Sequence, residues 1–174
     1  MQFKGNSKLL GINASLYRLK GQDLVISILP QLPDCKLILL GTGKEEVFYR
    51  NLAEKYAVSD RIYWAGFRKN AVDYLLYYDL FLFPSNSEGC PLALLEAASI
   101  NKKIVCSDIP VHKEMFSGTE VTFFSIKDPK SLLPAIINAL SGSDKQPKLQ
   151  KHFQETFSSE IIYNRLIEIY LRKK

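Results

Sequence analysis

Histidine and cysteine are scarce in this sequence. The only histidines are His112 and His152, and the only cysteines are Cys35, Cys90 and Cys106. An odd number of cysteines without CxxC spacing argues against a framework of disulfide bonds and favours a reducing compartment. Two widely separated histidines are too few for a zinc site, so we expect no bound metal.

Long apolar runs are also absent, and none reaches the roughly 18 residues needed to span a bilayer. The first residues, MQFKGNSKLLG, lack the apolar region and cleavage site of a signal peptide, so we expect a cytoplasmic protein. The net charge of +5 favours an ordinary solvated surface, with attraction to anionic ligands or to the inner face of a membrane as the alternative. Nucleic acid is not an expected partner, because no reader motif accompanies the charge.

The sequence does contain a regular alternation of short apolar runs and longer periodic segments. The apolar runs predict strands at residues 9–15, 36–43, 61–66, 79–85, 103–108 and 121–125. Helical spacing predicts helices at residues 21–32, 45–58, 70–78, 91–100, 128–141 and 158–174. In the second of these helices we expect Val47, Leu52 and Tyr56 on the inner side.

Strands that are apolar on both faces and separated by helices indicate right-handed crossovers and a parallel sheet. We therefore predict an α/β fold, a doubly wound, Rossmann-like parallel sheet. Residues 1–142 are expected to form this domain, and residues 143–174 a helical tail behind a flexible-looking connection, GSDKQPKL (142–149). Ligands bind such sheets at the carboxyl ends of the strands, which directs attention to the loops that follow them.

One loop and the helix after it, PSNSEGCPLALLEAASI (84–100), hold two carboxylates, Glu88 and Glu96. Between them a helix begins, and its free backbone N–H groups near Cys90, Leu92 and Ala93 favour an anion. Carboxylates accept hydrogen bonds from hydroxyl groups, so a phosphate flanked by sugars, as in a nucleoside diphosphate sugar, fits the pattern. The alternative is that Glu88 only stabilises the helix start and that Glu96 points to solvent. The apolar neighbours of Glu96 favour a partner for its charge.

The pattern E-G-C-P-L-A-L-L-E, with Pro-Ser shortly before it, resembles the E-x7-E signature of retaining glycosyltransferases of the GT-B fold, in particular the nucleotide-sugar-dependent group 1 family. Other stretches resemble further parts of the donor-binding lobe of that family, in register over residues 9 to 140: ASLYRLKGQDLVI, KLILLGTGKEE, IYWAGF, YYDLFLFPS and SDIPVHKE. The resemblance implies sugar transfer in polysaccharide biosynthesis, with retention at the anomeric carbon. It also implies no essential metal or cofactor, since the nucleotide-sugar is the donor substrate.

The resemblance assigns roles to individual residues, with Glu88 and Lys20 as the catalytic ones. Glu88 would contact hydroxyls of the donor sugar, and Glu96 would hold the ribose diol. Lys20, together with Arg18, would neutralise the diphosphate. The remaining contacts would come from the backbone, with Gly89, Cys90, Pro91 and Leu92 facing the sugar and phosphate, and Gly66 and Phe67 facing the base.

The sequence departs from the family at a few positions. Arg18 is displaced by one residue from the usual arginine. Asn101 stands where the family often has glycine after the signature helix, and asparagine tolerates the left-handed conformation needed there. Val111 and His112 stand where many relatives have glycines, and we interpret His112 as a histidine of a surface loop, with a contact to the substrate as the alternative. Cys90 has no histidine beside it in sequence, so we interpret it as a lining residue rather than a nucleophile.

A GT-B enzyme has two lobes, and the resemblance covers the donor-binding one. We expect an N-terminal lobe, from a longer chain or a separate one, to hold an acceptor glycan or lipid-linked glycan, with the helical tail packed back toward it. The parent enzyme would then associate peripherally with a membrane, and this chain would be inactive alone. Two alternatives remain, a lobe of a nucleotide-sugar epimerase and a non-catalytic nucleotide-binding or regulatory α/β domain.

Overall fold

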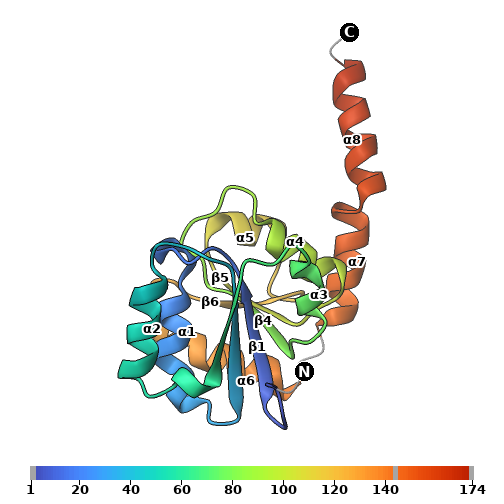
Figure 1. Ribbon diagram of the computed structural model, residues 1–174. Helices are drawn as coiled ribbons and strands as arrows, with labels where there is room; N and C mark the ends of the chain where they lie inside the picture. The colour runs from blue at the N-terminus through green and yellow to red at the C-terminus, as the bar shows by residue number, and fades with distance from the viewer. Residues whose placement is uncertain (1–2, 143–144, 173–174) are drawn as a thin grey trace.

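The computed structural model describes residues 3–142 and 145–172, built around a single parallel sheet (Figure 1). Its strands are β1 (Lys8–Asn13), β2 (Cys35–Leu40), β3 (Ile62–Gly66), β4 (Leu80–Phe83), β5 (Ile104–Ser107) and β6 (Thr122–Phe124). They lie in the order β3-β2-β1-β4-β5-β6, and every neighbouring pair is parallel. The order reverses between β1 and β4, as in a doubly wound sheet, so the predicted fold class is confirmed.

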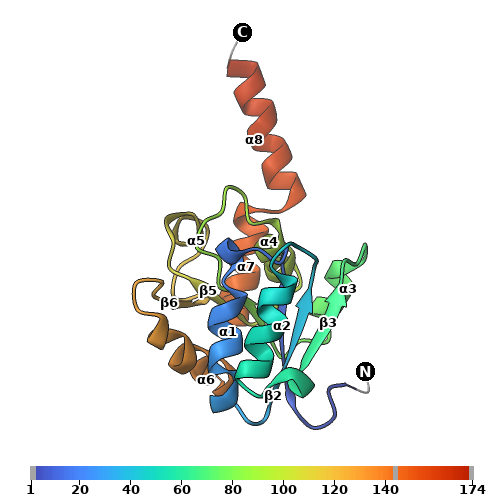
Figure 2. The ribbon, with the colours of Figure 1, turned by 60° about the vertical axis from the view of Figure 1, so that its left-hand side comes forward.

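Helices cover both faces of the sheet (Figures 1 and 2). One face carries α1 (Gln22–Ile28), α2 (Glu46–Lys55) and α6 (Leu132–Ser141), and the other carries α3 (Ala71–Leu75), α4 (Leu92–Ser99) and α7 (Gln146–Thr156). The helix α5 (Pro110–Met115) follows β5, and α8 (Ser159–Arg172) extends away from the body of the domain. Short 3-10 helices lie at Arg18–Lys20 (η1), Leu29–Gln31 (η2), Ser59–Arg61 (η3) and Pro129–Ser131 (η4).

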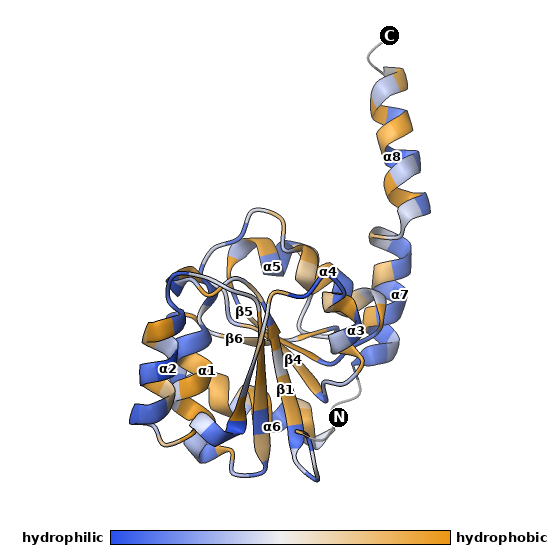
Figure 3. Ribbon diagram, viewed as in Figure 1, coloured by the Kyte–Doolittle hydropathy of each residue, from blue (hydrophilic) through white to orange (hydrophobic). Residues whose placement is uncertain are grey.

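The core consists of two hydrophobic clusters, one on each face of the sheet. Successive side chains of a strand point to opposite faces, so in β1 Leu10 joins the cluster under α1, α2 and α6, while Leu9 joins the other. In β4 Leu82 and Phe81 divide in the same way, and all four side chains are buried. Figure 3 shows this as strands that are hydrophobic along most of their length. Burial on both faces is why the strands appear in the sequence as continuous apolar runs.

Two helices of the structure were not predicted. The segment SDIPVHKE, expected as a loop, contains α5, and α7 begins at Gln146 inside the connection 142–149 that was expected to be flexible. Residues 143–144 of that connection lie outside the described residues. In both helices a proline, Pro110 or Pro147, occupies the first turn, where the missing N–H has no helical partner to lose. A proline that looks like a break in the sequence therefore starts each helix.

The inner face of α2 also differs from the prediction. Val47 is 69% exposed, whereas Tyr49 and Ala53 are buried. Leu52 and Tyr56 are partly buried against the same core. Tyr49 fixes the rotation of the helix, because a residue two positions away, such as Val47, points to nearly the opposite side.

The remaining features concern the cysteines and the tail. Cys35, Cys90 and Cys106 are all free, as their odd number suggested.

The predicted final helix is present as α8, and large apolar side chains are exposed along it: Ile162, Tyr163, Leu166, Ile167, Ile169, Tyr170 and Leu171. Over the part of the chain that the structure describes, no helix combines the length and the apolarity needed to cross a bilayer.

Gly11 offers a test of how tightly β1 packs against the start of β4. A Cβ atom on Gly11 would lie 2.1 Å from the Tyr78 ring, whose hydroxyl is anchored by donating to Oδ1 of Asn13 at 2.8 Å. Gly11→Ala is therefore expected to lower the free energy of unfolding by about 1–3 kcal/mol, because the ring cannot move without losing that bond. Gly118→Ala is the matched control, since an added Cβ there meets no atom within 4 Å. Urea denaturation of both variants measures the difference, and equal losses would contradict the expected close packing.

Candidate functional site

A pocket of about 230 Å³ opens at the carboxyl edge of the sheet, where the strand order reverses. Three segments line it, namely the residues after β1, the helix η1, and the loop from β4 into α4. The lining residues are Asn13, Ala14, Ser15, Lys20, Phe83, Glu88, Cys90, Pro91, Leu92 and Ala93. This is the edge at which doubly wound sheets bind their ligands.

An ion pair between Lys20 and Glu88 crosses one side of the pocket. The Nζ atom of Lys20 lies 2.7 Å from Oε1 of Glu88, and the two side chains are 26% and 9% exposed. The fold thus brings together two predicted catalytic residues that are 68 positions apart in sequence. No described residue donates a hydrogen bond to Oε2 of Glu88, and the ammonium group keeps N–H donors beyond the one that Glu88 accepts. The pair therefore retains an acceptor and a donor for a ligand.

The helix η1 is fastened directly to the loop after β4. Gly21 ends η1 with φ 69°, and a Cβ atom there would lie 2.2 Å from the carbonyl oxygen of Pro84. In the same loop, the backbone N–H of Asn86 donates to the carbonyl of Leu19 at 2.7 Å. Only glycine combines the left-handed conformation with this close approach at low cost. The glycine of the lysine-glycine loop is therefore what allows Lys20 to reach Glu88.

The residues after β1 were not predicted as part of the site. Asn13 is held from both ends, because it accepts from the Tyr78 hydroxyl at 2.8 Å and donates to the carbonyl of Ala71 at 3.1 Å. Burial raises the pKa of Tyr78 well above its usual range, so its hydroxyl remains a donor. Ser15 is fixed by its carbonyl, which accepts from the side chain of Gln22 at 2.9 Å. The place of these residues at the carboxyl end of β1, beside the strand-order reversal, is the signal that would have found them.

One of the N–H groups expected to be free at the start of α4, that of Leu92, is already engaged. The N–H of Leu92 donates to the carbonyl of Cys90 at 2.9 Å, and the N–H groups of Leu94 and Leu95 donate to Pro91. The N–H groups of Gly89, Cys90 and Ala93 have no hydrogen-bond partner among the described residues. Cys90 is exposed and lines the pocket, in agreement with its interpretation as a lining residue. An anion at this point would meet the N–H groups of Gly89, Cys90 and Ala93 rather than that of Leu92.

Glu96 lies on α4 but does not line the pocket. The buried face of α4 consists of Leu94, Ala97 and Ala98, and Glu96 is half-buried on a different side. Its carboxylate has no hydrogen bond or ion pair within the part of the chain that is described, so the expected partner for its charge is not present. Because residues four apart share a face, Glu96 lies one turn beyond Leu92 along the helix. The structure thus places one of the two carboxylates in the pocket and the other farther along the same helix.

Four further predicted residues also lie outside the pocket lining, namely Arg18, Gly66, Phe67 and Gly89. Arg18 pairs through Nε with Glu45 at 2.9 Å, and its guanidinium stacks 3.4 Å from the centre of the Phe48 ring. Lys20 is therefore the one cation among the residues that line the pocket. Gly66 ends β3 at the same edge of the sheet, and its carbonyl accepts from the N–H of Gly41, while the next side chain, Phe67, is 69% exposed.

Comparison with known proteins decides the family. The chain matches the family described as glycosyl transferases group 1 over residues 2–156. It belongs to this family. The relatives of this group 1 chain include the O-antigen biosynthesis glycosyltransferase WclY of Escherichia coli, 31% identical over 93% of this chain and 46% of the relative. The lipopolysaccharide core biosynthesis mannosyltransferase LpsB of Rhizobium meliloti is 31% identical over 82% of this chain and 43% of its own length. The chain thus spans less than half the length of these two relatives.

A solved structure supports the same fold for this group 1 chain. The Anabaena protein HepE, crystallised with UDP and glucose, superposes with a TM-score of 0.86 at 20% identity. The match covers 97% of this chain and 49% of HepE. At this identity the likeness shows the fold alone, here the GT-B lobe whose sheet order and pocket are described above.

Two departures of this group 1 chain from the family pattern now have a structural outcome. Asn101 adopts φ 57° just after α4, so the predicted left-handed helix end is confirmed.

His112 is fully buried in α5, with its ring 5.3 Å from the Phe83 ring, so its interpretation as a surface residue was wrong. The cause is the unpredicted α5, which turns this residue inward. Burial lowers the pKa of His112, so the neutral ring is favoured.

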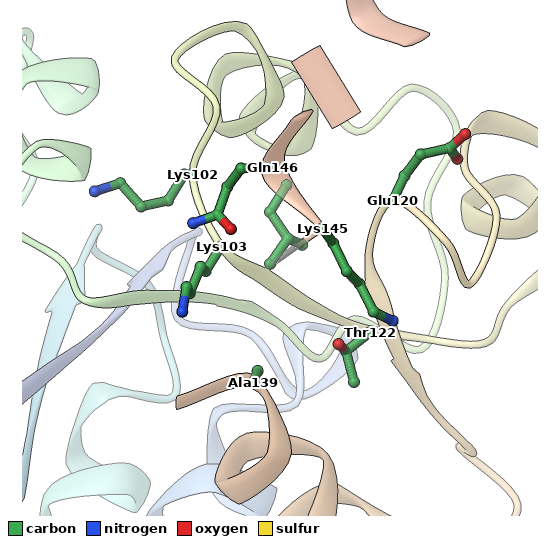
Figure 4. A pocket seen from close by; sticks show the side chains of 8 residues that line it. Lys102, Lys103, Glu120, Thr122, Ala139, Lys145 and Gln146 are labelled. Carbon is green, nitrogen blue, oxygen red and sulfur yellow. The ribbon is translucent and has the colours of Figure 1, made fainter. Parts of the chain in front are cut away.

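Another pocket, lined by several lysines, lies at the opposite, amino edge of the sheet (Figure 4). Its lysines point in different directions rather than toward a common centre. Lys102 donates to the carbonyl of Tyr78 at 2.8 Å, and Lys145 donates to the carbonyls of Gly118 and Val121 at 2.6 and 2.9 Å. Burial lowers the pKa of both lysines. These cations stabilise carbonyl groups of the fold and leave the carboxyl edge as the candidate site.

Proposed function

We propose that this chain is the donor-binding half of a retaining glycosyltransferase, which transfers a sugar from a nucleoside diphosphate to an acceptor hydroxyl. The observation that carries the proposal is the Lys20–Glu88 pair in a pocket at the strand-order reversal of a group 1 domain. The presence of UDP and glucose in HepE, which has the same fold, supports the choice of ligand class. The biosynthetic roles printed for WclY and LpsB support polysaccharide synthesis as the setting.

In this proposal the residues of the pocket divide the donor between them. Lys20 and the free N–H groups of Gly89 and Cys90 stabilise the diphosphate charge that grows as the bond from the anomeric carbon to the phosphate oxygen breaks. Glu88 accepts hydrogen bonds from sugar hydroxyls and fixes the orientation of the anomeric carbon. Glu96, farther along α4, accepts from the ribose diol. The acceptor hydroxyl then bonds through its oxygen to the anomeric carbon from the face that the leaving group vacates and passes its proton to the departing phosphate oxygen, which gives retention.

The base and the diphosphate are the least completely matched parts of the donor. We propose that the backbone at Gly66 and the exposed Phe67 face the base, because β3 ends at the same edge of the sheet as the pocket. Arg18 contributes to the diphosphate only if it leaves Glu45 and Phe48, so Lys20 carries the larger part of that role. Donor binding should therefore depend far more on Lys20 than on Arg18.

The acceptor belongs to the other half of the proposed enzyme. The chain spans 46% of WclY and 43% of LpsB, so the transfer reaction, the glycan acceptor and any contact with a membrane are proposed for a two-lobed protein. We propose that the exposed apolar side of α8 packs against that second lobe, because seven large apolar side chains on one projecting helix are costly in water.

Donor binding is the direct test of the proposal. In calorimetric titrations with UDP-, GDP- and ADP-sugars, one donor class is expected to bind. Lys20→Met and Glu96→Gln are each expected to weaken binding of that donor about tenfold or more, because each variant loses a charged hydrogen bond. Glu54→Gln is the matched control, because Glu54 is exposed on α2, away from the pocket. Binding of no nucleotide at all would favour a non-catalytic regulatory domain, and binding unaffected by both site variants would rule out the proposed donor site.

Glu88→Gln is expected to strengthen binding of the free nucleoside diphosphate and to reduce the advantage that the nucleotide-sugar has over it. Removing the carboxylate releases Lys20 and takes one negative charge from the pocket, so the free nucleoside diphosphate should bind about two- to fivefold more tightly, as expected for loss of a competing ion pair of about 0.5–1 kcal/mol. The nucleotide-sugar should lose its advantage over the diphosphate, because the hydroxyl acceptor is weakened. Parallel titrations with both ligands measure this, and equal weakening of both would contradict the assigned role.

Turnover separates binding from transfer. This chain alone is expected to bind the donor without transferring the sugar to an added glycan acceptor, because the acceptor groups are proposed to lie on the other lobe. A coupled assay for released nucleoside diphosphate, with and without acceptor, measures this. Acceptor-dependent release by the chain alone would show that one lobe is sufficient.

A further inference from the structure

The hydrogen bonds around His112 determine which ring nitrogen carries its proton. Its Nδ1 atom lies 2.9 Å from the carbonyl oxygen of Ser107 and 3.1 Å from the hydroxyl of the same residue. A carbonyl can only accept, and the Ser107 hydroxyl already donates its proton to the carbonyl of Ser85. Both partners of Nδ1 therefore require a donor, so the neutral ring carries its proton on Nδ1 and leaves Nε2 as a bare acceptor.

The same bonds connect His112 to the loop that holds Glu88. The ring donates to Ser107 at the end of β5, Ser107 donates to the carbonyl of Ser85, and Glu88 follows three residues later. His112, Ser107 and Ser85 are buried, and the Phe83 ring lies against the imidazole. A donor at Nδ1 thus helps to hold the Glu88 loop above the ends of β4 and β5, together with the contacts of Asn86 and Lys20.

The opposite nitrogen of the ring has no such partner. Nε2 of His112 is buried without a hydrogen bond among the described residues, and the same holds for the hydroxyl of Ser85. Buried polar atoms normally have partners, so two such atoms beneath one loop are unusual in a native structure. The charged groups that act on the ring are Glu88 from the loop after β4 and Lys20 from η1.

The other neighbours of the ring carry no charge toward it. The strands β4 and β5 contribute Phe83 and Ser107. On α5 itself, Lys113 and Glu114 are exposed, and Lys113 pairs with Asp108 at 3.4 Å. A proton on Nε2 would therefore create a buried donor without a hydrogen-bond partner, and Glu88 is the carboxylate whose charge favours that protonated ring.

From this arrangement we infer that His112 is a positioning residue for Glu88. The neutral ring, protonated on Nδ1, holds the Glu88 loop through Ser107 and leaves the carboxylate on Lys20, facing the pocket. A second proton, on Nε2, draws the carboxylate toward the ring and away from both Lys20 and the ligand. This inference rests on the proposed function in one respect, that the ligand recognised by Glu88 is the sugar of a nucleotide donor.

The first test needs no ligand. Because the chain has only two histidines, long-range proton–nitrogen spectra of the protein and of its His152→Gln variant assign the His112 ring unambiguously. The Nδ1–H form is expected near neutral pH, and the ring should titrate below the ordinary histidine pKa of about 6.5. Glu88→Gln should lower the titration midpoint of His112 and Lys20→Met should raise it, since the carboxylate favours the imidazolium and the ammonium opposes it. An Nε2–H ring, or equal midpoints in all three proteins, would overturn the inference.

The second test measures recognition of the sugar. The ratio of the affinities for UDP-glucose and UDP, with the GDP-mannose and ADP-glucose pairs run alongside, is expected to fall about fivefold or more between about pH 8 and about pH 5. His112→Asn keeps a neutral donor near Nδ1 and cannot titrate, so its ratio should stay constant. His112→Phe fills the space without the donor and should have a low ratio at every pH, while His152→Gln should follow the unsubstituted protein.

The outcomes of the two tests separate the inference from the proposed function. A His112→Asn protein that loses its sugar preference at low pH as the unsubstituted protein does would overturn the inference while leaving donor binding intact. If no nucleotide binds to any of these proteins, the proposed function fails, and the titration midpoints in Glu88→Gln and Lys20→Met still decide whether His112 and Glu88 are coupled.

Discussion

The parallel pairing of β1 with β4 is the constraint on which the rest of the structure depends. It sets Leu10 beside Leu80 and Gly11 beside Phe81, although the two strands are far apart in sequence. The loops that leave their carboxyl ends must then lie side by side, and Gly21 lies so near Pro84 that a Cβ atom would not fit between them. The pocket, the ion pair and the buried histidine all lie above this junction, because it is the one place where the chain departs to both faces of the sheet.

The Lys20–Glu88 pair gives this junction its electrostatic character. Opposite charges that are 26% and 9% exposed are screened less than a surface pair, so the attraction both fastens the loops and occupies the cation. A ligand with a diphosphate and a hydroxyl-rich group can replace each half of this ion pair. Its negative charge can bind the ammonium group of Lys20, and its hydroxyl groups can donate to the carboxylate of Glu88. The arrangement therefore links recognition of the two parts of a nucleotide-sugar, since engaging one member of the pair releases the other.

Much of the fold could be predicted from the sequence, because burial on both faces of the sheet forces each strand into an apolar run. The incorrect predictions of helices and of buried side chains have local causes. Pro110 and Pro147 look like breaks but occupy first turns, where proline is tolerated, so α5 and α7 were not foreseen. Val47 was assigned to the core of α2 because apolarity alone does not fix the rotation of a helix, which the larger Tyr49 decides.

The candidate site was predictable to a different degree, because a motif identifies residues but not their partners. Lys20 and Glu88 lie together because both follow neighbouring strands of the sheet, although the resemblance assigned them separate roles and did not predict their ion pair. Arg18, by contrast, pairs with Glu45 and stacks on Phe48 outside the pocket. Glu96 lies on a half-exposed side of α4, so the apolar residues beside it in sequence did not predict its surroundings. The role of His112 depends on a helix that sequence reasoning had missed. Six buried polar atoms lack partners among the described residues. Those of Gln22, Ser85 and His112 belong to segments around the Lys20–Glu88 junction, and the other three belong to Tyr49, Asn101 and Gln146. Such atoms cost stability, so the three around the junction agree with a site under functional rather than structural constraint.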